Sequence, residues 1–245
     1  MSLVITLRTP DGIVLASDTL TTLNRADNPP QGGNQPATRT VASFPVSFAA
    51  SKVFPFLETF GVGTTGTPII ADKSVGRLLR ELETELASAP VSLTVENAAD
   101  KIGARIARSM KTAPDAESRN ASVEFVVSGY EQDGAPIDAI RRVAAGTVTG
   151  SSKPGQPGLG LSAVGEGGVV GAFMQLAKSL QLEPAVRFIA LPDAVAFATF
   201  LIEATGGFQR FFLAPQTVGR DVDVGIIEPG EAFRWVRRAS QAALK

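Results

Sequence analysis

The chain has 245 residues, of which 44% are hydrophobic, and no low-complexity boundary divides it, so we expect a single domain with a large core over residues 1–245. Its 23 basic and 24 acidic residues leave a formal net charge of -1, which excludes the basic excess typical of nucleic-acid-binding proteins and polybasic membrane patches. The chain contains no histidine and no cysteine, which excludes Ser-His-Asp and Cys-His catalysis, disulfides, and zinc sites built on these residues. We expect neither a metal nor a cofactor.

Hydropathy and the start of the sequence give an expectation for location. No apolar run approaches about 18 residues, the length that predicts a transmembrane helix. The sequence begins Met-Ser-Leu-Val-Ile, without a signal peptide. We therefore expect a cytoplasmic protein that contacts neither membranes nor nucleic acid.

The first element is a predicted β-hairpin. Leu3–Thr9 and Ile13–Ser17 are rich in β-branched residues, and between them Pro10 presets φ while Gly12 accepts φ > 0. Ser2 then lies at the tip of a buried strand, and its small size favours removal of the initiator methionine. After that removal its hydroxyl is a candidate nucleophile. In a chain without histidine, the α-amine, with an ordinary pKa of about 8, can serve as the base near neutral pH.

The next part of the chain combines a loop with a second pair of strands. Thr19–Thr40 is polar and shows no periodicity, so we expect a long exposed loop. Val46–Ala50 and Leu57–Val62 predict strands, and Lys52 lies between them.

Two helices are predicted after these strands. The first has Thr67 as its N-cap and Pro68 in its first turn, and apolar residues recur at helical spacing to about Ala87. The second follows a Thr94 cap and extends to about Met110. Two helices joined by a short link predict an antiparallel helical layer.

The second half follows the same order of elements. We expect strands at Ala121–Gly129 and Pro136–Ala145, a Gly/Ser/Pro-rich loop at Gly150–Gly160, a strand at Leu161–Val164, helices over Val170–Leu180 and Val195–Ile202, and strands at Asp221–Ile227 and Phe233–Val236. A parallel α/β fold would alternate single strands with single helices. Paired hairpins and paired helices instead predict an α+β fold with two stacked antiparallel sheets, each covered by two helices, which is a four-layer αββα sandwich.

Four features together resemble the β-type subunits of the proteasome family: Ser2 at the start, the hairpin that ends Ile13-Val-Leu-Ala-Ser-Asp18, Lys52 at the opening of the next hairpin, and Gly63-Thr-Thr-Gly66 before an amphipathic helix. Bacterial ring proteases of that family are the most similar, namely the heat-shock-locus peptidase, the ancestral β-subunit type and the betaproteobacterial homologue. The element order agrees over nearly the whole chain, and the residue-level likeness covers its N-terminal third.

The resemblance implies an N-terminal nucleophile hydrolase fold and an endopeptidase that cleaves peptides or unfolded proteins inside stacked homo-oligomeric rings. Ser2 would supply the hydroxyl and the amine, and would carry an ester intermediate. Lys52 resembles the buried lysine whose charge lowers both pKa values, and Asp18 resembles the carboxylate that pairs with it. The Gly66 N–H would face the oxyanion, next to a helix N-terminus. Since the chain has no ATPase segment, any unfoldase partner is a separate ATPase chain.

Three positions depart from the family pattern. The nucleophile there is usually threonine, and Ser2 lacks the methyl group that restricts its rotamer. Glu166 stands where the family has a serine that supports the N-terminal amine. Its carboxylate can hold the ammonium, and it can also raise the pKa of the amine and slow the base step. The family's later aspartate has no counterpart near Pro215–Gly219.

The same residues leave other functions open. The Glu166 change favours a catalytically inactive ring scaffold, and the same fold also serves amidases that act on small amides. Gly61–Gly66 matches the dinucleotide-binding pattern G-x-G-x-x-G, but the acid-tipped strand that such a site needs would fall in the helix predicted at Arg80–Leu86. Gly160–Gly165 resembles a nucleophile elbow that is one residue too long, and there is no histidine to serve it.

Overall fold

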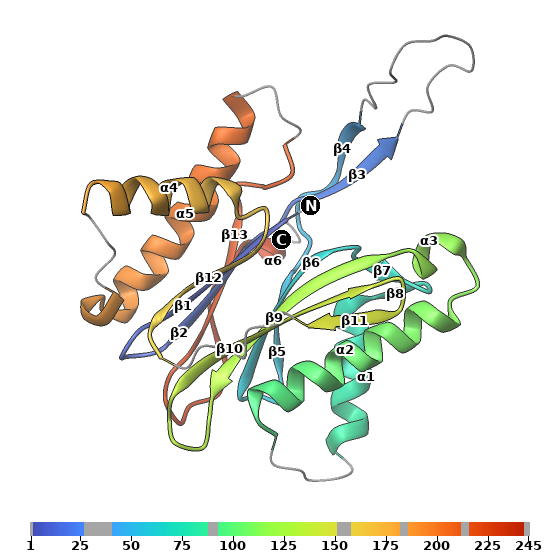
Figure 1. Ribbon diagram of the computed structural model, residues 1–245, viewed down its shortest axis with the longest axis horizontal. Helices are drawn as coiled ribbons and strands as arrows, with labels where there is room; N and C mark the ends of the chain where they lie inside the picture. The colour runs from blue at the N-terminus through green and yellow to red at the C-terminus, as the bar shows by residue number, and fades with distance from the viewer. Residues whose placement is uncertain are drawn as a thin grey trace.

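The computed structural model describes residues 2–26, 41–87, 93–150, 158–181, 186–211 and 216–242. It is an α+β protein built on two five-stranded antiparallel sheets, as expected for the fold class (Figure 1). Within the described part of the chain, no helix combines the length and the apolar character needed to cross a membrane.

The first sheet has the N-terminal hairpin near its centre. β1 lies between β12 and β2, and β2 pairs in turn with β13. The turn between the two strands is confirmed, since the Thr9 N–H donates to the Gly12 carbonyl at 2.9 Å, but the positive φ expected at Gly12 is wrong. The strands of this sheet are β1 (Leu3–Arg8), β2 (Ile13–Asp18), β12 (Gly160–Gly165), β13 (Val222–Ile227) and β14 (Arg234–Arg238).

The second sheet has the order β11-β10-β9-β6-β5. Its β9–β10 hairpin confirms the two strands predicted there. β11 was not predicted, because all of its residues are exposed and leave no hydrophobic alternation. The strands are β5 (Val53–Phe56), β6 (Phe60–Gly66), β9 (Ser122–Tyr130), β10 (Pro136–Ala144) and β11 (Thr147–Gly150).

Each sheet is packed against a pair of long helices. α1 (Val75–Ala87) and α2 (Val95–Thr112) share a hydrophobic cluster with the second sheet, and α4 (Gly168–Ser179) and α5 (Leu191–Phe211) share one with the first. The predicted cap of α2 is confirmed, since Thr94 Oγ1 accepts from the Asn97 N–H at 3.2 Å. The shorter elements are α3 (Ala116–Arg119), η1 (Val186–Phe188) and α6 (Ala239–Ala242).

The two sheets approach each other closely through β6. A Cβ at Gly61 would lie 2.7 Å from a methyl group of Leu15, and one at Gly63 would lie 2.4 Å from a methyl group of Val4. Both glycines stand inside a strand that is paired on both edges, so the G-x-G-x-x-G match reflects sheet packing and forms no phosphate-binding loop. Gly160–Gly165 likewise forms a strand, β12, and no nucleophile elbow.

The loop predicted over Thr19–Thr40 is wrong at its beginning. β3 (Thr21–Ala26) pairs with β4 (Val41–Ser47), and residues 27–40 lie outside the described part. The two threonines that open β3 have high β-propensity, which outweighs the polar composition of the segment. The strand predicted at Val46–Ala50 accordingly ends at Ser47.

The first helix begins later than predicted. β7 (Ile69–Ile70) and β8 (Lys73–Ser74) precede α1, joined by a turn in which Ala71 and Asp72 have positive φ values of 48° and 60°. Ser74 Oγ accepts from the Arg77 N–H at 3.2 Å and so caps the helix. The second predicted loop, Gly150–Gly160, falls largely on residues 151–157, outside the described part.

Candidate active site

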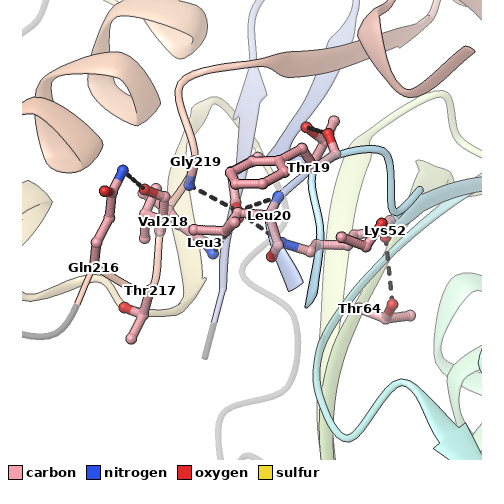
Figure 2. A network of polar contacts seen from close by, with 12 residues as sticks. Leu3, Thr19, Leu20, Lys52, Thr64, Gln216, Thr217, Val218 and Gly219 are labelled. Carbon is pink, nitrogen blue, oxygen red and sulfur yellow. Dashed lines mark hydrogen bonds and ion pairs between the residues drawn. The ribbon is translucent and has the colours of Figure 1, made fainter. Parts of the chain in front are cut away.

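Asp18 is the centre of a buried polar network at the end of β2. The residue is fully buried, and its Oδ1 accepts from the Leu3 N–H at 2.9 Å. Oδ2 accepts from the N–H groups of Leu20 and Gly219, both at 3.0 Å (Figure 2). One carboxylate thus joins the beginning of β1, the end of β2 and the segment that precedes β13.

Lys52 completes this network from the segment before β5. It is 7% exposed, and its Nζ donates to Asp18 Oδ2 at 2.7 Å and to the Leu20 carbonyl at 2.5 Å. Burial lowers the pKa of Lys52, while the charges of Asp18 and Asp223 and the hydrogen bond to Asp18 oppose that shift. The Thr64 N–H donates to the Lys52 carbonyl at 2.8 Å, and the Thr64 hydroxyl donates to the same carbonyl at 3.4 Å (Figure 2), so Lys52 is tied to β6. The structure therefore brings together the two residues that the resemblance paired.

Ser2 is held through the backbone on both sides. It is 6% exposed, its carbonyl accepts from the Glu166 N–H at 2.9 Å, and the next N–H, that of Leu3, is bound by Asp18. Gly165 pairs with Leu3 across β12 and β1, and its φ is +85°. A Cβ at Gly165 would lie 2.0 Å from the Ser2 carbonyl oxygen, so only glycine allows β12 to approach Ser2 this closely.

Two cavities meet at Ser2. The larger, of about 470 Å³, is lined by Ser2 and Lys52, and its walls include the apolar residues Val46, Phe54, Ile69 and Val75. The smaller, of about 340 Å³, is lined by polar and charged residues and by glycines. Ser2, Thr65 and Gly66 line both cavities, and the smaller one adds Ser122, Glu124, Arg142 and Gly165. A substrate bound across Ser2 would therefore meet an apolar wall on one side and a charged one on the other.

Gly66 ends β6 between the two cavities, next to Ser2. A Cβ there would lie 2.2 Å from the Ser122 carbonyl oxygen, so a larger residue would push β6 away from β9. The prediction that a helix N-terminus directly follows Gly66 is wrong, because β7 and β8 intervene and α1 begins only at Val75. Val75 and Gly76, at the start of α1, still line the larger cavity together with Gly66.

The acidic residue that lines a cavity beside Ser2 is not the one that the sequence singled out. Glu166 contacts Ser2 through its backbone N–H, and its side chain lines neither of the two cavities. Glu124, on β9, lines the smaller cavity, and its Oε2 accepts from the Gly165 N–H at 3.2 Å. Sequence reasoning missed Glu124 because only the β6–β9 register brings it beside the nucleophile.

The segment before β13 contributes backbone groups where the family has an aspartate. Gly219 donates its N–H to Asp18. The segment is fixed in turn by Gln209 of α5, whose Oε1 accepts from the N–H groups of Thr217 and Val218, both at 2.9 Å. Asp223, whose charge acts to raise the pKa of Lys52, accepts hydrogen bonds from the N–H and the hydroxyl of Ser240 at 2.9 and 2.6 Å.

A scan against models of known protein families finds no match, and a search of curated proteins finds no related sequence. The residues around Ser2 and their geometry therefore have to indicate the function.

Proposed function

We propose that the chain is an N-terminal-nucleophile endopeptidase whose nucleophile is Ser2, exposed as the chain end once Met1 is removed. One observation carries the proposal. Ser2 and Lys52 line the same cavity, and Asp18 binds both the Lys52 ammonium, at 2.7 Å, and the N–H of Leu3, at 2.9 Å. A single buried carboxylate thereby fixes the lysine relative to the residue that follows the nucleophile.

The packing of the sheets supports the finer proposal of a four-layer αββα sandwich of the N-terminal nucleophile hydrolase type. Two hydrophobic clusters combine residues from both sheets, one around Leu15 and Val53 and the other around Val4 and Val126. The outer clusters join the second sheet to α1 and α2, and the first sheet to α4 and α5 (Figure 1). In such a stack, β1 delivers Ser2 to the end of the interface between the sheets.

The chemistry follows from groups that this chain provides. The Ser2 α-amine takes the hydroxyl proton as Oγ bonds to the substrate carbonyl carbon, and it passes that proton to the leaving nitrogen as the C–N bond breaks. Water then attacks the ester carbon and gives a proton to the amine, and as the C–Oγ bond breaks the ammonium returns that proton to Oγ, which frees the carboxylic acid and restores the Ser2 hydroxyl. The Lys52 ammonium lowers the pKa of the hydroxyl and of the amine. The Gly66 N–H stabilises the oxyanion.

Two observations favour this activity over the alternatives of an inactive scaffold and a small-amide hydrolase. The scaffold interpretation depended on the carboxylate of Glu166, which lines neither cavity beside Ser2. The small-amide interpretation requires little space, whereas the cavities of about 470 and 340 Å³ offer room on both sides of the nucleophile. The space on both sides fits residues that flank a peptide bond.

We further propose that copies of the chain assemble into stacked rings that admit peptides or unfolded proteins, with any ATPase unfoldase supplied as a separate chain. Support comes from large apolar side chains that are exposed on α4 and α5, an arrangement typical of interaction surfaces. Phe173 and Phe200 join the two helices by an edge-to-face ring contact at 5.8 Å. The exposed set consists of Phe173, Leu176, Leu180, Phe200, Phe208 and Phe211.

A double substitution on this surface tests the assembly. Phe173→Asp with Phe200→Asp is expected to dissociate the oligomer into monomers, because each charge would have to be buried unpaired in the interface. Native mass spectrometry measures the result. Val236→Asp on β14 is the matched control, since Val236 is 45% exposed and Phe200 is 47% exposed. A monomeric wild type, or equal dissociation in the control, contradicts the proposed surface.

Covalent labelling tests the nucleophile directly. A peptide epoxyketone reacts with a hydroxyl and an amine of one residue, so the wild type is expected to lack Met1 and to gain one adduct that maps to Ser2. Ser2→Ala is expected to abolish the adduct. Ser162→Ala, in β12, is the control and should leave labelling unchanged, because Ser162 lines neither cavity. Retention of Met1, or labelling that survives Ser2→Ala, rejects the proposal.

A further inference from the structure

The smaller cavity beside Ser2 is crossed by a row of polar side chains. In the antiparallel registers of the second sheet, Thr65 of β6 is the partner of Glu124 of β9, and Glu124 is the partner of Arg142 of β10. Directly opposed residues of antiparallel strands project from the same face of a sheet. This face continues to Val126, which packs against Val4 of the first sheet. Glu124 and Arg142 therefore line the cavity at the end of the interface between the sheets, next to Ser2.

The two charges of this row remain available to a ligand. Within the described part of the chain, Glu124 accepts only a backbone N–H, that of Gly165, at 3.2 Å, and the Arg142 Nε donates to Ser122 Oγ at 3.4 Å. Among the residues that the structure describes, no carboxylate forms an ion pair with Arg142. Its neighbour Arg141, on the opposite face of β10, contrasts with it, because that guanidinium is bound by carboxylates of α2.

We infer that the smaller cavity is the subsite for the leaving half of the substrate, and that Arg142 selects an acidic side chain at the first residue after the scissile bond. The inference rests on the proposed function. Cleavage leaves one half as an ester on Ser2 and releases the other half as an amine, which becomes an ammonium in water. Glu124 complements that ammonium, so the cavity that Glu124 lines suits the leaving half.

Arg142 then determines which residue is accepted there. A guanidinium binds a carboxylate through two parallel hydrogen bonds, which gives both affinity and orientation. The released half with aspartate or glutamate at its first position carries an ammonium and a carboxylate, and these match the opposite charges of Glu124 and Arg142. A lysine at that position would place its ammonium against the guanidinium and be rejected by repulsion.

Three internally quenched peptides test this assignment. They share every residue except the one after the scissile bond, which is glutamate, glutamine or lysine. The wild type is expected to cleave the glutamate peptide with a kcat/KM at least about tenfold above that of the lysine peptide, with the glutamine peptide between them. Arg142→Gln should flatten the order and Arg142→Glu should reverse it. The control Arg108→Glu, an exposed arginine of α2, should keep the wild-type order.

Labelling by the peptide epoxyketone separates the subsite from the nucleophile, because the label occupies only the acyl half of the site. Arg142→Glu is expected to be labelled at the wild-type rate. Equal kcat/KM values for the three peptides, or an order that survives Arg142→Glu, overturn the subsite while labelling still supports Ser2. Loss of labelling in Arg142→Glu alone also overturns it. A wild type that is neither labelled nor active overturns the proposed function itself.

Discussion

Replacing Lys52 by alanine is expected to lower the free energy of unfolding by about 3 kcal/mol, because it leaves the buried carboxylate of Asp18 without its charged partner. The same change should slow epoxyketone labelling of Ser2 at least about a hundredfold, since the charge that activates the hydroxyl and the amine is lost. Urea unfolding and the time course of adduct formation by intact mass measure the two effects.

Lys73→Ala is the matched control for this substitution. Lys73 forms an ion pair with Glu81 at 2.9 Å, close to the 2.7 Å of the Lys52 pair. The side chains of Lys73 and Glu81 are 38% and 27% exposed, whereas the Lys52 pair is buried. Exposed pairs contribute about 0–1 kcal/mol, so this variant should unfold and label almost as the wild type does. If the two lysine variants behaved alike, the buried network would have no special role.

The pH dependence of the Lys52 effect gives a second readout. Burial lowers the pKa of Lys52 in the folded protein below its ordinary value of 10.5. Between those two values the unfolded chain binds more protons than the folded chain, so the free energy of unfolding contributed by Lys52 rises as the pH increases through this window. Subtracting the same curve for Lys52→Met isolates this rise. A difference that falls with pH would contradict the direction of the shift.

Gly165→Ala is expected to abolish labelling of Ser2 and to destabilise the protein. The new Cβ would lie 2.0 Å from the Ser2 carbonyl oxygen and 2.9 Å from a methyl group of Thr65, so either Ser2 or β12 has to move. A displacement of about 1 Å at a nucleophile can cost about a hundredfold in rate. Labelling kinetics and urea unfolding again provide the measurement.

Gly134→Ala distinguishes the effect of the steric clash with Ser2 from the effect of backbone strain at a positive φ. Gly134 has a φ of +80°, close to the +85° of Gly165, but a Cβ there would meet no atom within 4 Å. Both variants place alanine in the left-handed region, at a cost of about 1–2 kcal/mol, and only Gly165→Ala adds the clash with Ser2. Equal labelling of the two variants would show that β12 does not fix the position of Ser2.

Local signals in the sequence were sufficient for the elements that local chemistry determines. The hairpin turn after Pro10 and the cap at Thr94 are confirmed because proline and an N-cap hydroxyl act within a few residues, although Gly12 lacks the positive φ expected of it. The predicted start of α1 was wrong, and the cause is again local. Thr67 was the predicted cap, but the short β7–β8 turn lies between it and the helix, and Ser74 caps the helix instead.

The candidate site depends on contacts that no local pattern contains. Asp18 and Lys52 are 34 residues apart, and only the resemblance to a known family placed them together. Glu124 and Arg142 became neighbours of Ser2 through the strand registers, which a sequence does not reveal when several pairings are compatible with its alternation. Glu166 was predicted as a site residue because of its position in the family pattern, yet it lines neither of the two cavities.

The bond from Gly219 to Asp18 has a consequence for biosynthesis. Gly219, whose N–H helps to fix the Asp18 carboxylate, is translated 201 residues after Asp18. Under the proposed function, a nascent polypeptide would therefore lack the complete lysine–carboxylate network until Gly219 has been added. The proposed activity would be delayed by synthesis itself, so that growing chains on the same polysome would not cleave one another.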